Sequence, residues 1–444
     1  MKVLSLFDGM ACGMLAMLEA GLPVDRYVAY EIDKYAVQTS THNFPMIEHR
    51  GDVFKANFTE FFGFDFLIGG SPCTYWSVAQ KNNRETEASG MGWDLFSQYV
   101  RALHEAKPMF FIYENNKSMS KAIRQSITET FGFEPICINS ALVSAQNRQR
   151  LYWVGKRNAD GTYSNVEVEQ PEDRGILLRD VLECGERIPK YGADDKSRPI
   201  NALYPNNCGG FEHIMFSDKR KKQQVDMICE PVGVGYRGRM DNGKWVKQYE
   251  SNVTGKANAI TTAQTDSMVA EPVYIGAVPE NKGTYLNGKQ PSQQYRVFDP
   301  NGKGVAVTTC AITNVPERVG FYPPCATPCE WDEDGNPIKA VSAADGKVYT
   351  VYKVKDGQIT IKGKTYPIKL PDGFYIFRKL TVRECMRLQT VPEWYEFPVS
   401  NAQAYKMLGN GWTVSVIAHL INATQNAETM SGQLDLFTML EHWG

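Results

Sequence analysis

Long hydrophobic runs are missing from this sequence. Apolar residues make up 43% of the 444 residues, yet no uninterrupted run approaches the roughly 20 residues that a helix needs to cross a bilayer. The N-terminal residues reach the acidic Asp8 without the long apolar region and cleavage site of a secretory signal. We therefore expect a soluble, cytoplasmic protein without membrane contact.

Closely spaced cysteines are also scarce. The ten cysteines form no CxxC motif, and a chain of this length needs no disulfides to hold its core. Only Cys325 and Cys329 lie close together in sequence, and no second pair of ligands is near them. We predict reduced thiols and no metal site.

An excess of positive charge is the third absence. Lysine and arginine total 48 against 50 aspartate and glutamate, a net charge of −2, so any surface that binds nucleic acid must be a local patch. The basic run Lys219–Lys222 is one candidate, and the alternative is a solvated loop or helix end.

Apolar runs alternate with helical stretches through the first 155 residues or so. This alternation predicts a parallel sheet with helices on both faces, a doubly wound α/β domain over residues 1–189. Helical composition is clearest at Leu15–Ala20 and Leu95–Ala106. The strand-like runs are Val3–Phe7, Tyr27–Tyr30, Phe64–Ile68, Met109–Tyr113, Ile136–Ile138 and Leu151–Val154.

The composition changes near residue 190. Short β-type runs separated by Gly, Pro and Asn predict a second, mainly β domain over residues 190–375. Repeated segments within it indicate an internal duplication, which either presents similar loops to an extended ligand or only builds a common core. The repeats are Glu230–Val232 with Glu271–Val273, and Gly255–Thr262 with Gly302–Thr309.

Helical patterns return over residues 376–425. Leu380–Glu384 is typical of a helix start, and a last amphipathic helix is predicted from Val414 to about Ala423. We expect these helices to rejoin the first domain.

Reactive and polar residues follow the predicted strands where each strand ends. Pro72 restricts the backbone at Cys73, which is either a positioned nucleophile or a small buried side chain. Gly9 marks a strand-to-helix turn that a ligand can approach, and the carboxylates Glu31 and Asp52 follow the next two strands. This arrangement is typical of a site for an adenosine-type cofactor.

Glu114 and two arginines are predicted at the same edge of the sheet. Glu114 closes a strand, and ligands of open α/β sheets bind at the carboxyl ends of the strands. Arg148 and Arg150 stand two positions apart before the strand Leu151–Val154, so we expect both side chains to point toward that edge. Guanidinium groups there suit a carbonyl or phosphate oxygen.

Eight segments of the sequence, from Phe7–Gly9 to Leu408–Trp412, resemble those of the DNA (cytosine-5) methyltransferase family and come in the same order. The forms Phe7-Asp8-Gly9 and Gly411-Trp412 are most similar to the branch of the de novo methyltransferases. The resemblance implies a Rossmann-like, S-adenosylmethionine-dependent catalytic domain, completed by residues 376–425, with a target-recognition domain inserted at 190–375. The matching segments are Phe7–Gly9, Tyr30–Asp33, Gly51–Val53, Gly70–Cys73 with Ser77, Glu114–Asn115, Gln146–Arg150, Arg378–Tyr395 and Leu408–Trp412.

The resemblance also implies a mechanism. Cys73, as a thiolate, would add to C6 of a cytosine flipped out of double-stranded DNA, which activates C5 toward the methyl group of S-adenosyl-L-methionine. Glu114 would hold N3 and the exocyclic amine, and Arg150 with Arg148 would face O2 and the thiolate. Glu31 would bind the ribose and Asp52 the adenine amine. The residues implied to bind the cofactor are Phe7, Asp8, Gly9, Glu31, Ile32, Asp52, Val53, Pro72, Asn410 and Trp412.

Two positions depart from the family pattern. Thr74 stands where the family has Gln, and Asn116 where it has Val. The segment Thr74–Trp93 is expected to be the mobile loop that closes over the flipped base, and the alternative is an ordinary surface loop.

The tail, residues 426–444, carries a separate motif. It resembles the peptide by which bacterial proteins bind the DNA-polymerase sliding clamp, which would couple methylation to replication in a bacterial or phage-infected cell. The alternative is a final amphipathic turn that packs on the core. The motif comprises Gln433, Leu434, Asp435, Leu436 and Phe437.

Two other functions are compatible with this fold. A catalytically silent DNA-binding regulator is disfavoured because Cys73, Glu114 and both arginines are present. An RNA methyltransferase of related chemistry is disfavoured by the long middle domain, which favours duplex DNA.

Overall fold

The computed structural model divides into two compact units. The first unit comprises Met1–Ile176, Ala259–Ala263 and Cys385–Gly444, and the second comprises Leu177–Asn258 and Gln264–Glu384. The structure describes residues 1–77, 84–183, 213–218, 223–228, 231–241, 244–252, 254–262, 267–273, 326–334 and 336–441.

The first unit is built on a largely parallel sheet with the strand order β3-β2-β1-β4-β5-β8-β6. β1 pairs in parallel with β2 and β4, and β4 with β5, whereas β8 runs antiparallel to both β5 and β6. The predicted doubly wound α/β sheet is therefore confirmed. The strands are β1 (Lys2–Leu6), β2 (Arg26–Tyr30), β3 (Glu48–His49), β4 (Phe66–Gly69), β5 (Phe110–Asn116), β6 (Ile136–Asn139) and β8 (Gln149–Arg157), and β9 (Tyr163–Asn165) pairs with β8.

The register of this sheet aligns the ends of neighbouring strands. Leu6 pairs with Tyr30 on one side and with Gly69 on the other, and Gly69 pairs with Tyr113. The residues that follow these positions therefore emerge at one edge of the sheet, as parallel strands require.

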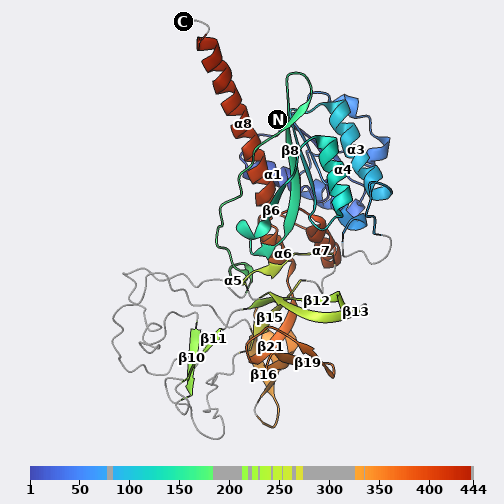
Figure 1. Cartoon of the computed structure of the whole chain (residues 1–444). Helices are drawn as coiled ribbons and strands as arrows, with labels where there is room; N and C mark the ends of the chain where they lie inside the picture. Colours follow the sequence, from blue (N-terminus) through green and yellow to red (C-terminus); the bar gives the residue numbers. More distant parts are fainter. Residues whose placement is uncertain are drawn as a thin grey trace. The chain divides into compact units, whose positions relative to one another are not determined.

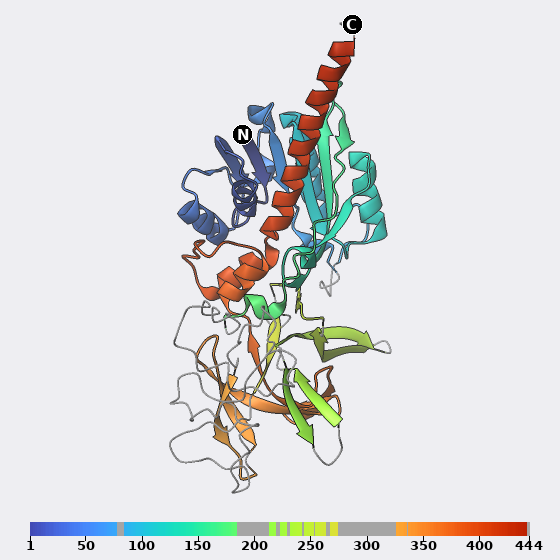
Figure 2. The ribbon, with the colours of Figure 1, turned by 90° about the vertical axis from the view of Figure 1, so that its left-hand side faces the viewer.

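Helices cover both faces of the sheet. α3 and α4 lie on one face, and α1 and α8 lie on the other (Figures 1 and 2). The helices of this unit are α1 (Cys12–Glu19), α2 (Lys34–Asn43), α3 (Met91–Ala106), α4 (Lys121–Phe131), α7 (Asn401–Asn410) and α8 (Val414–Glu441), and α6 (Val382–Leu388) begins just before Cys385. α4 shows why they start and stop here: the Ser120 hydroxyl caps the Ile123 N–H, and Gly132 ends the helix with φ 83°.

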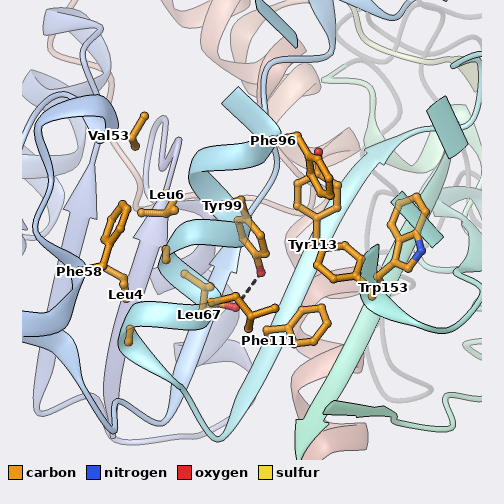
Figure 3. Packing of buried hydrophobic residues seen from close by; sticks show 14 of the residues in the cluster. Leu4, Leu6, Val53, Phe58, Leu67, Phe96, Tyr99, Phe111, Tyr113 and Trp153 are labelled. Atoms are coloured by element: carbon orange, nitrogen blue, oxygen red, sulfur yellow. Dashed lines mark hydrogen bonds between the residues drawn. The ribbon is translucent and has the colours of Figure 1, made fainter. Parts of the chain in front are cut away.

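Aromatic side chains dominate the core beneath α3 and α4. The fully buried Tyr99 of α3 lies beside Tyr113 of β5, and its hydroxyl is 3.2 Å from the Leu67 carbonyl and 2.9 Å from the Ile112 carbonyl (Figure 3). The hydroxyl thus contacts the backbone of β4, the strand that precedes Cys73, and of β5, the strand that contains Glu114. Burial of a polar hydroxyl is tolerated because it has partners.

The second unit contains a mainly antiparallel sheet with the order β13-β12-β15-β21-β18-β17-β16, which confirms the predicted β character of the middle of the chain. Its strands are β12 (Val232–Asp241), β13 (Lys244–Asn252), β15 (Met268–Pro272), β16 (Ala326–Trp331), β17 (Pro337–Ser342), β18 (Val348–Lys355), β19 (Gln358–Ile361), β20 (Lys364–Pro367) and β21 (Gly373–Lys379). The repeat Gly302–Thr309, the basic run Lys219–Lys222 and Cys325 lie outside the described residues.

A buried ion triad joins two strands of the second unit to Glu384, the last residue of that unit. The guanidinium of Arg378 in β21 lies 2.6 Å from the Glu271 carboxylate of β15 and 2.7 Å from the Glu384 carboxylate of α6, and all three side chains are fully buried. The Ser342 hydroxyl donates to the second oxygen of Glu271. Burying these charges is tolerated because each finds a charged partner.

The last helix is longer than predicted. We expected it to end near Ala423, but α8 continues to Glu441 and includes the backbone of Gln433–Phe437. No proline interrupts this stretch, and the single Gly432 costs only about 1 kcal/mol in a helix. Within the described ranges no helix is both long and apolar enough to span a membrane.

Removing the arginine of the triad should strongly destabilise the second unit. Arg378→Ala leaves two buried carboxylates without a cation, so we expect a loss of about 3–5 kcal/mol in the free energy of unfolding, measured by urea titration. Lys339→Ala, which removes an exposed ion pair with Glu330, is the control and should leave the urea midpoint of unfolding unchanged. Equal midpoints for both variants would contradict this assignment.

Candidate active site

The turn between β1 and α1 forms one side of the candidate site. Phe7, Gly9 and Ala11 all have positive φ angles near 60°, so the chain makes a tight turn in the left-handed region. The Gly9 N–H donates to the Glu31 carboxylate (2.8 Å), which joins the ends of β1 and β2.

Glu31 is held by its own strand end as well. Its other carboxylate oxygen accepts from the backbone N–H groups of Ile32 and Asp33 at 2.8 and 2.7 Å. Ile32 itself is 79% exposed, an unusual position for a large apolar side chain. An open apolar surface beside a fixed carboxylate suits a ligand with a flat ring and hydroxyl groups.

Asp52 and Val53 lie at the neighbouring end of the sheet. Asp52 caps a short 3-10 helix, Val53–Lys55, by accepting from the Phe54 N–H at 3.0 Å, and Val53 is buried. Phe7 is half-buried and packs against the aromatic core. The structure thus brings Phe7, Gly9, Glu31, Ile32 and Asp52 to one region of the sheet edge.

Asp8 is a buried acid at this turn. Burial raises the pKa of its carboxyl to about 6, although hydrogen bonds from Ser5 and Tyr27 to Oδ1 oppose the shift. Its Oδ2 is buried and has no hydrogen-bond partner among the described residues. A polar ligand group that donates to this oxygen would satisfy it, so the turn fits a cofactor with hydrogen-bond donors.

Glu114 is the centre of the second side of the site. Arg150 Nε lies 3.0 Å from Glu114 Oε1, and the Trp412 indole N–H donates to Oε2 at 3.0 Å. A Cβ atom at Gly70 would lie 2.9 Å from Oε2 and 2.7 Å from the Glu114 carbonyl. Gly70 is therefore required where the segment leading to Cys73 passes this carboxylate.

The backbone that leads to Cys73 is hydrogen-bonded to β5. The Ser71 carbonyl accepts from the Asn115 side chain (3.2 Å), and the Ser71 and Tyr113 hydroxyls lie 2.7 Å apart. Cys73 then begins a 3-10 helix, Cys73–Tyr75, whereas Pro72 and Thr74 are exposed. The structure thus places the Cys73 backbone next to the strand that carries Glu114.

The unusual Asn116 has a defined place beneath this site. It is buried; its backbone N–H donates to the Asn115 side chain, and its side-chain oxygen accepts from the Ser118 hydroxyl at 2.8 Å. Asn116 therefore fixes the turn that follows β5.

The structure separates the two arginines. Arg150 pairs with Glu114, whereas Arg148 is buried and contacts backbone carbonyls. Its guanidinium donates to the carbonyls of Ile260 (2.9 Å), Gly409 (3.3 Å) and Gly411 (2.9 Å). Arg148 precedes β8, so the alternation of side chains along a strand does not apply to it. Its charge lies at the C-terminus of α7, where carbonyls attract a cation.

Asn410 and Trp412 lie in the segment that Arg148 holds. Asn410 is exposed and is the last residue of α7. The same segment is held by Gln389, whose role the sequence did not indicate: its side chain donates to the Leu408 carbonyl (2.6 Å) and accepts from Thr413 (2.9 Å). Only its burial among polar partners, seen in the structure, identifies it.

The expected loop Thr74–Trp93 is shorter in the structure. α3 begins at Met91, so Trp93 is helical, and Trp76 is fully buried. Residues 78–83 lie outside the described residues.

The chain belongs to the C-5 cytosine-specific DNA methylase family, whose model matches residues 1–426. It is 25% identical to the orphan methyltransferase M.SPRI of Bacillus phage SPR over 94% of this chain and 95% of that protein. It is 23% identical to the type II methyltransferase M.HgiCI of Herpetosiphon aurantiacus, over 95% and 97% of the two chains. Among solved structures, the S. pombe Dnmt2 methyltransferase aligns with a TM-score of 0.42 at 13% identity, over 95% of this chain and 96% of that one. The match to the family model confirms, at the level of the family, the resemblance seen in the sequence.

Replacing Asp8 should change how stability depends on pH. The folded-state pKa of about 6 lies above the ordinary 3.8, so ionising this carboxyl in the folded protein costs up to about 3 kcal/mol, a cost that appears as pH rises from 4 to 6. The free energy of unfolding of Asp8→Asn, relative to the unchanged protein, should therefore increase over that range in urea titrations. Glu167→Gln removes an exposed carboxylate and is the control; a pH-independent difference for Asp8→Asn would contradict the assignment.

Proposed function

We propose that this protein transfers a methyl group from S-adenosyl-L-methionine to C5 of a cytosine flipped out of double-stranded DNA. The observation that carries the proposal is the convergence of Gly70, Arg150 and Trp412 on the Glu114 carboxylate, beside the backbone of Cys73. These residues come from four separate segments of the chain.

The cofactor would bind at the ends of β1, β2 and β3. Glu31 would accept from the ribose hydroxyls, and Ile32 offers an open apolar surface for the adenine. Asp8 Oδ2, which has no hydrogen-bond partner in the described part of the chain, would accept a donor. When bound, the cofactor supplies an electrophilic methyl group on a sulfonium. The set we assign to it is Phe7, Asp8, Gly9, Glu31, Ile32, Asp52, Val53, Pro72, Asn410 and Trp412.

The remaining chemistry belongs to this chain's own residues. The Cys73 thiolate forms a bond to C6 of the cytosine, and the electron pair of the C5–C6 double bond becomes available at C5. Glu114 accepts from the exocyclic amine and shares a proton with N3, while Arg150 faces O2 and stabilises the charge that develops there. After methylation a base removes the C5 proton, the C6–S bond breaks, and the thiolate leaves.

We assign Arg148 a supporting part in this site. Its contacts with the carbonyls of Gly409 and Gly411 fix the segment that carries Asn410 and Trp412. Arg148 thus acts through Trp412, which donates to Glu114.

Duplex DNA as the partner is supported by the hairpin of β12 and β13 within residues 190–375, which we propose to be the target-recognition domain. The hairpin reaches outward at the edge of its sheet (Figures 1 and 2) and exposes Arg239, Trp245 and Lys247. A two-stranded ribbon fits the major groove of B-DNA, and cations attract its phosphates. The relatives named orphan and type II methyltransferases support a role in DNA modification. Binding of a sliding clamp by Gln433–Phe437 stays a prediction from sequence.

Methyl transfer from labelled S-adenosyl-L-methionine tests the proposal. We expect the protein to label duplex DNA and to form a covalent complex with duplex DNA that contains 5-fluorocytosine. Cys73→Ser should abolish both, and Glu114→Gln should lower the rate about 10²-fold or more because it removes the group that stabilises the activated ring.

The controls separate the competing functions. Label on a structured RNA but not on DNA would assign an RNA methyltransferase. DNA binding without transfer would assign a silent regulator, and either result would reject the proposal.

A further inference from the structure

The segment just after the Cys73 turn is anchored by a carboxylate that the mechanism does not use. Trp76 is fully buried in the aromatic core, and its indole N–H donates to Glu85 Oε2 at 3.0 Å. The Glu85 backbone N–H donates to the Tyr75 carbonyl at 2.9 Å. Glu85 therefore contacts both the 3-10 helix that begins at Cys73 and the residue that follows it.

The same carboxylate reaches the start of α3. The Gly92 N–H lies 3.1 Å from Glu85 Oε2 and 3.3 Å from Oε1. A negative charge is favourable at the N-terminus of a helix, where the first N–H groups lack intrahelical partners. Glu85 thus joins the Cys73 turn to α3, the helix whose Tyr99 meets the backbone of β4 and β5.

Two glycines make room for this carboxylate. A Cβ atom at Gly92 would lie 2.6 Å from Glu85 Oε2 and 2.5 Å from the Trp76 indole nitrogen, and one at Gly90 would lie 2.5 Å from Glu85 Oε1. Gly90 also has φ +83°, a conformation that other residues rarely adopt. Glycine is therefore needed at both positions 90 and 92 to leave space for the Glu85 carboxylate.

Arg84 extends the connection to the strand of Glu114. Its Nε donates to the Trp76 carbonyl at 3.1 Å, and its Nη2 donates to the Ser118 carbonyl at 2.6 Å. Ser118 lies four residues after Glu114, in the turn that Asn116 fixes. Beside it, the Ser120 hydroxyl donates to the Thr86 carbonyl.

We propose that Arg84 and Glu85 form a positioning pair that sets the backbone of Cys73 against the strand that carries Glu114. The pair, which we call the Arg84–Glu85 clasp, holds the segment that follows Cys73 and the turn that follows the strand of Glu114. The inference rests on the proposed function. Because the clasp lies outside the candidate cofactor residues, its loss slows formation of the C6–S bond and leaves cofactor binding unchanged.

The test compares Glu85→Ala with Glu87→Ala, which removes an exposed acid two residues away. For Glu85→Ala we expect kcat, and the rate of adduct formation with 5-fluorocytosine duplex DNA, to fall about 10- to 100-fold through misplacement of the reacting groups. The dissociation constant of the cofactor should equal that of Glu87→Ala. The stoichiometry of cofactor binding, which reports the fraction of folded protein, should also be the same in both variants. Glu85→Gln keeps the shape and one acceptor oxygen, so it should recover part of the loss.

Trp76→Phe provides a second variant if Glu85→Ala does not fold. It keeps a buried aromatic ring but removes the indole N–H, and we expect a smaller fall in adduct rate with unchanged cofactor binding. Amide hydrogen exchange at residues 74–77 should rise in both variants and not in Glu87→Ala, a readout that needs no methyl transfer.

Each failure has its own signature. If the protein without substitutions transfers no methyl group to DNA, the proposed function is rejected. Amide hydrogen exchange at residues 74–77 in the variants then still tests the clasp. An active protein whose Glu85→Ala variant matches Glu87→Ala in kcat, adduct rate and exchange rejects the clasp alone.

Discussion

The Glu114 carboxylate, fixed by a cation on one side and an indole N–H on the other, is the interaction on which the candidate site depends. Arg150 offsets its charge, and Trp412 orients its second oxygen. Gly70 is needed because any side chain there would collide with this carboxylate. Three segments far apart in sequence are thus placed by one acidic group, and one of them, at Gly70, leads to Cys73.

Much of the fold could be predicted because parallel strands impose a simple geometry. Apolar runs identified the strands, and parallel pairing brings their carboxyl ends to one edge. The observed register, which aligns Leu6 with Tyr30 and Gly69, is the reason why Glu31 and Gly70 emerge together. The positions of these residues followed from strand ends alone, whereas the roles assigned to them rest on the family resemblance.

The parts that could not be predicted depend on contacts between distant segments. Arg148 was expected to share the orientation of Arg150, but its carbonyl partners at Ile260, Gly409 and Gly411 lie more than 100 positions away along the chain. A two-residue spacing fixes direction only inside a strand, and Arg148 lies just outside one. The predicted end of α8 was wrong for a different reason, because no local signal in the sequence marks the end of this helix before Glu441.

Two arginine–carboxylate groups in this chain differ in how far they are buried, and this difference decides whether a ligand can reach them. The triad of Arg378, Glu271 and Glu384 is completely buried, and further donors such as the Ser342 hydroxyl share its oxygens, so it has no access to a ligand. The Arg150 and Glu114 side chains are 17% and 12% exposed and therefore keep a path to solvent. Both groups hold segments together, yet only the second can exchange a contact with water for one with a ligand, which is the property that the role proposed for Glu114 requires.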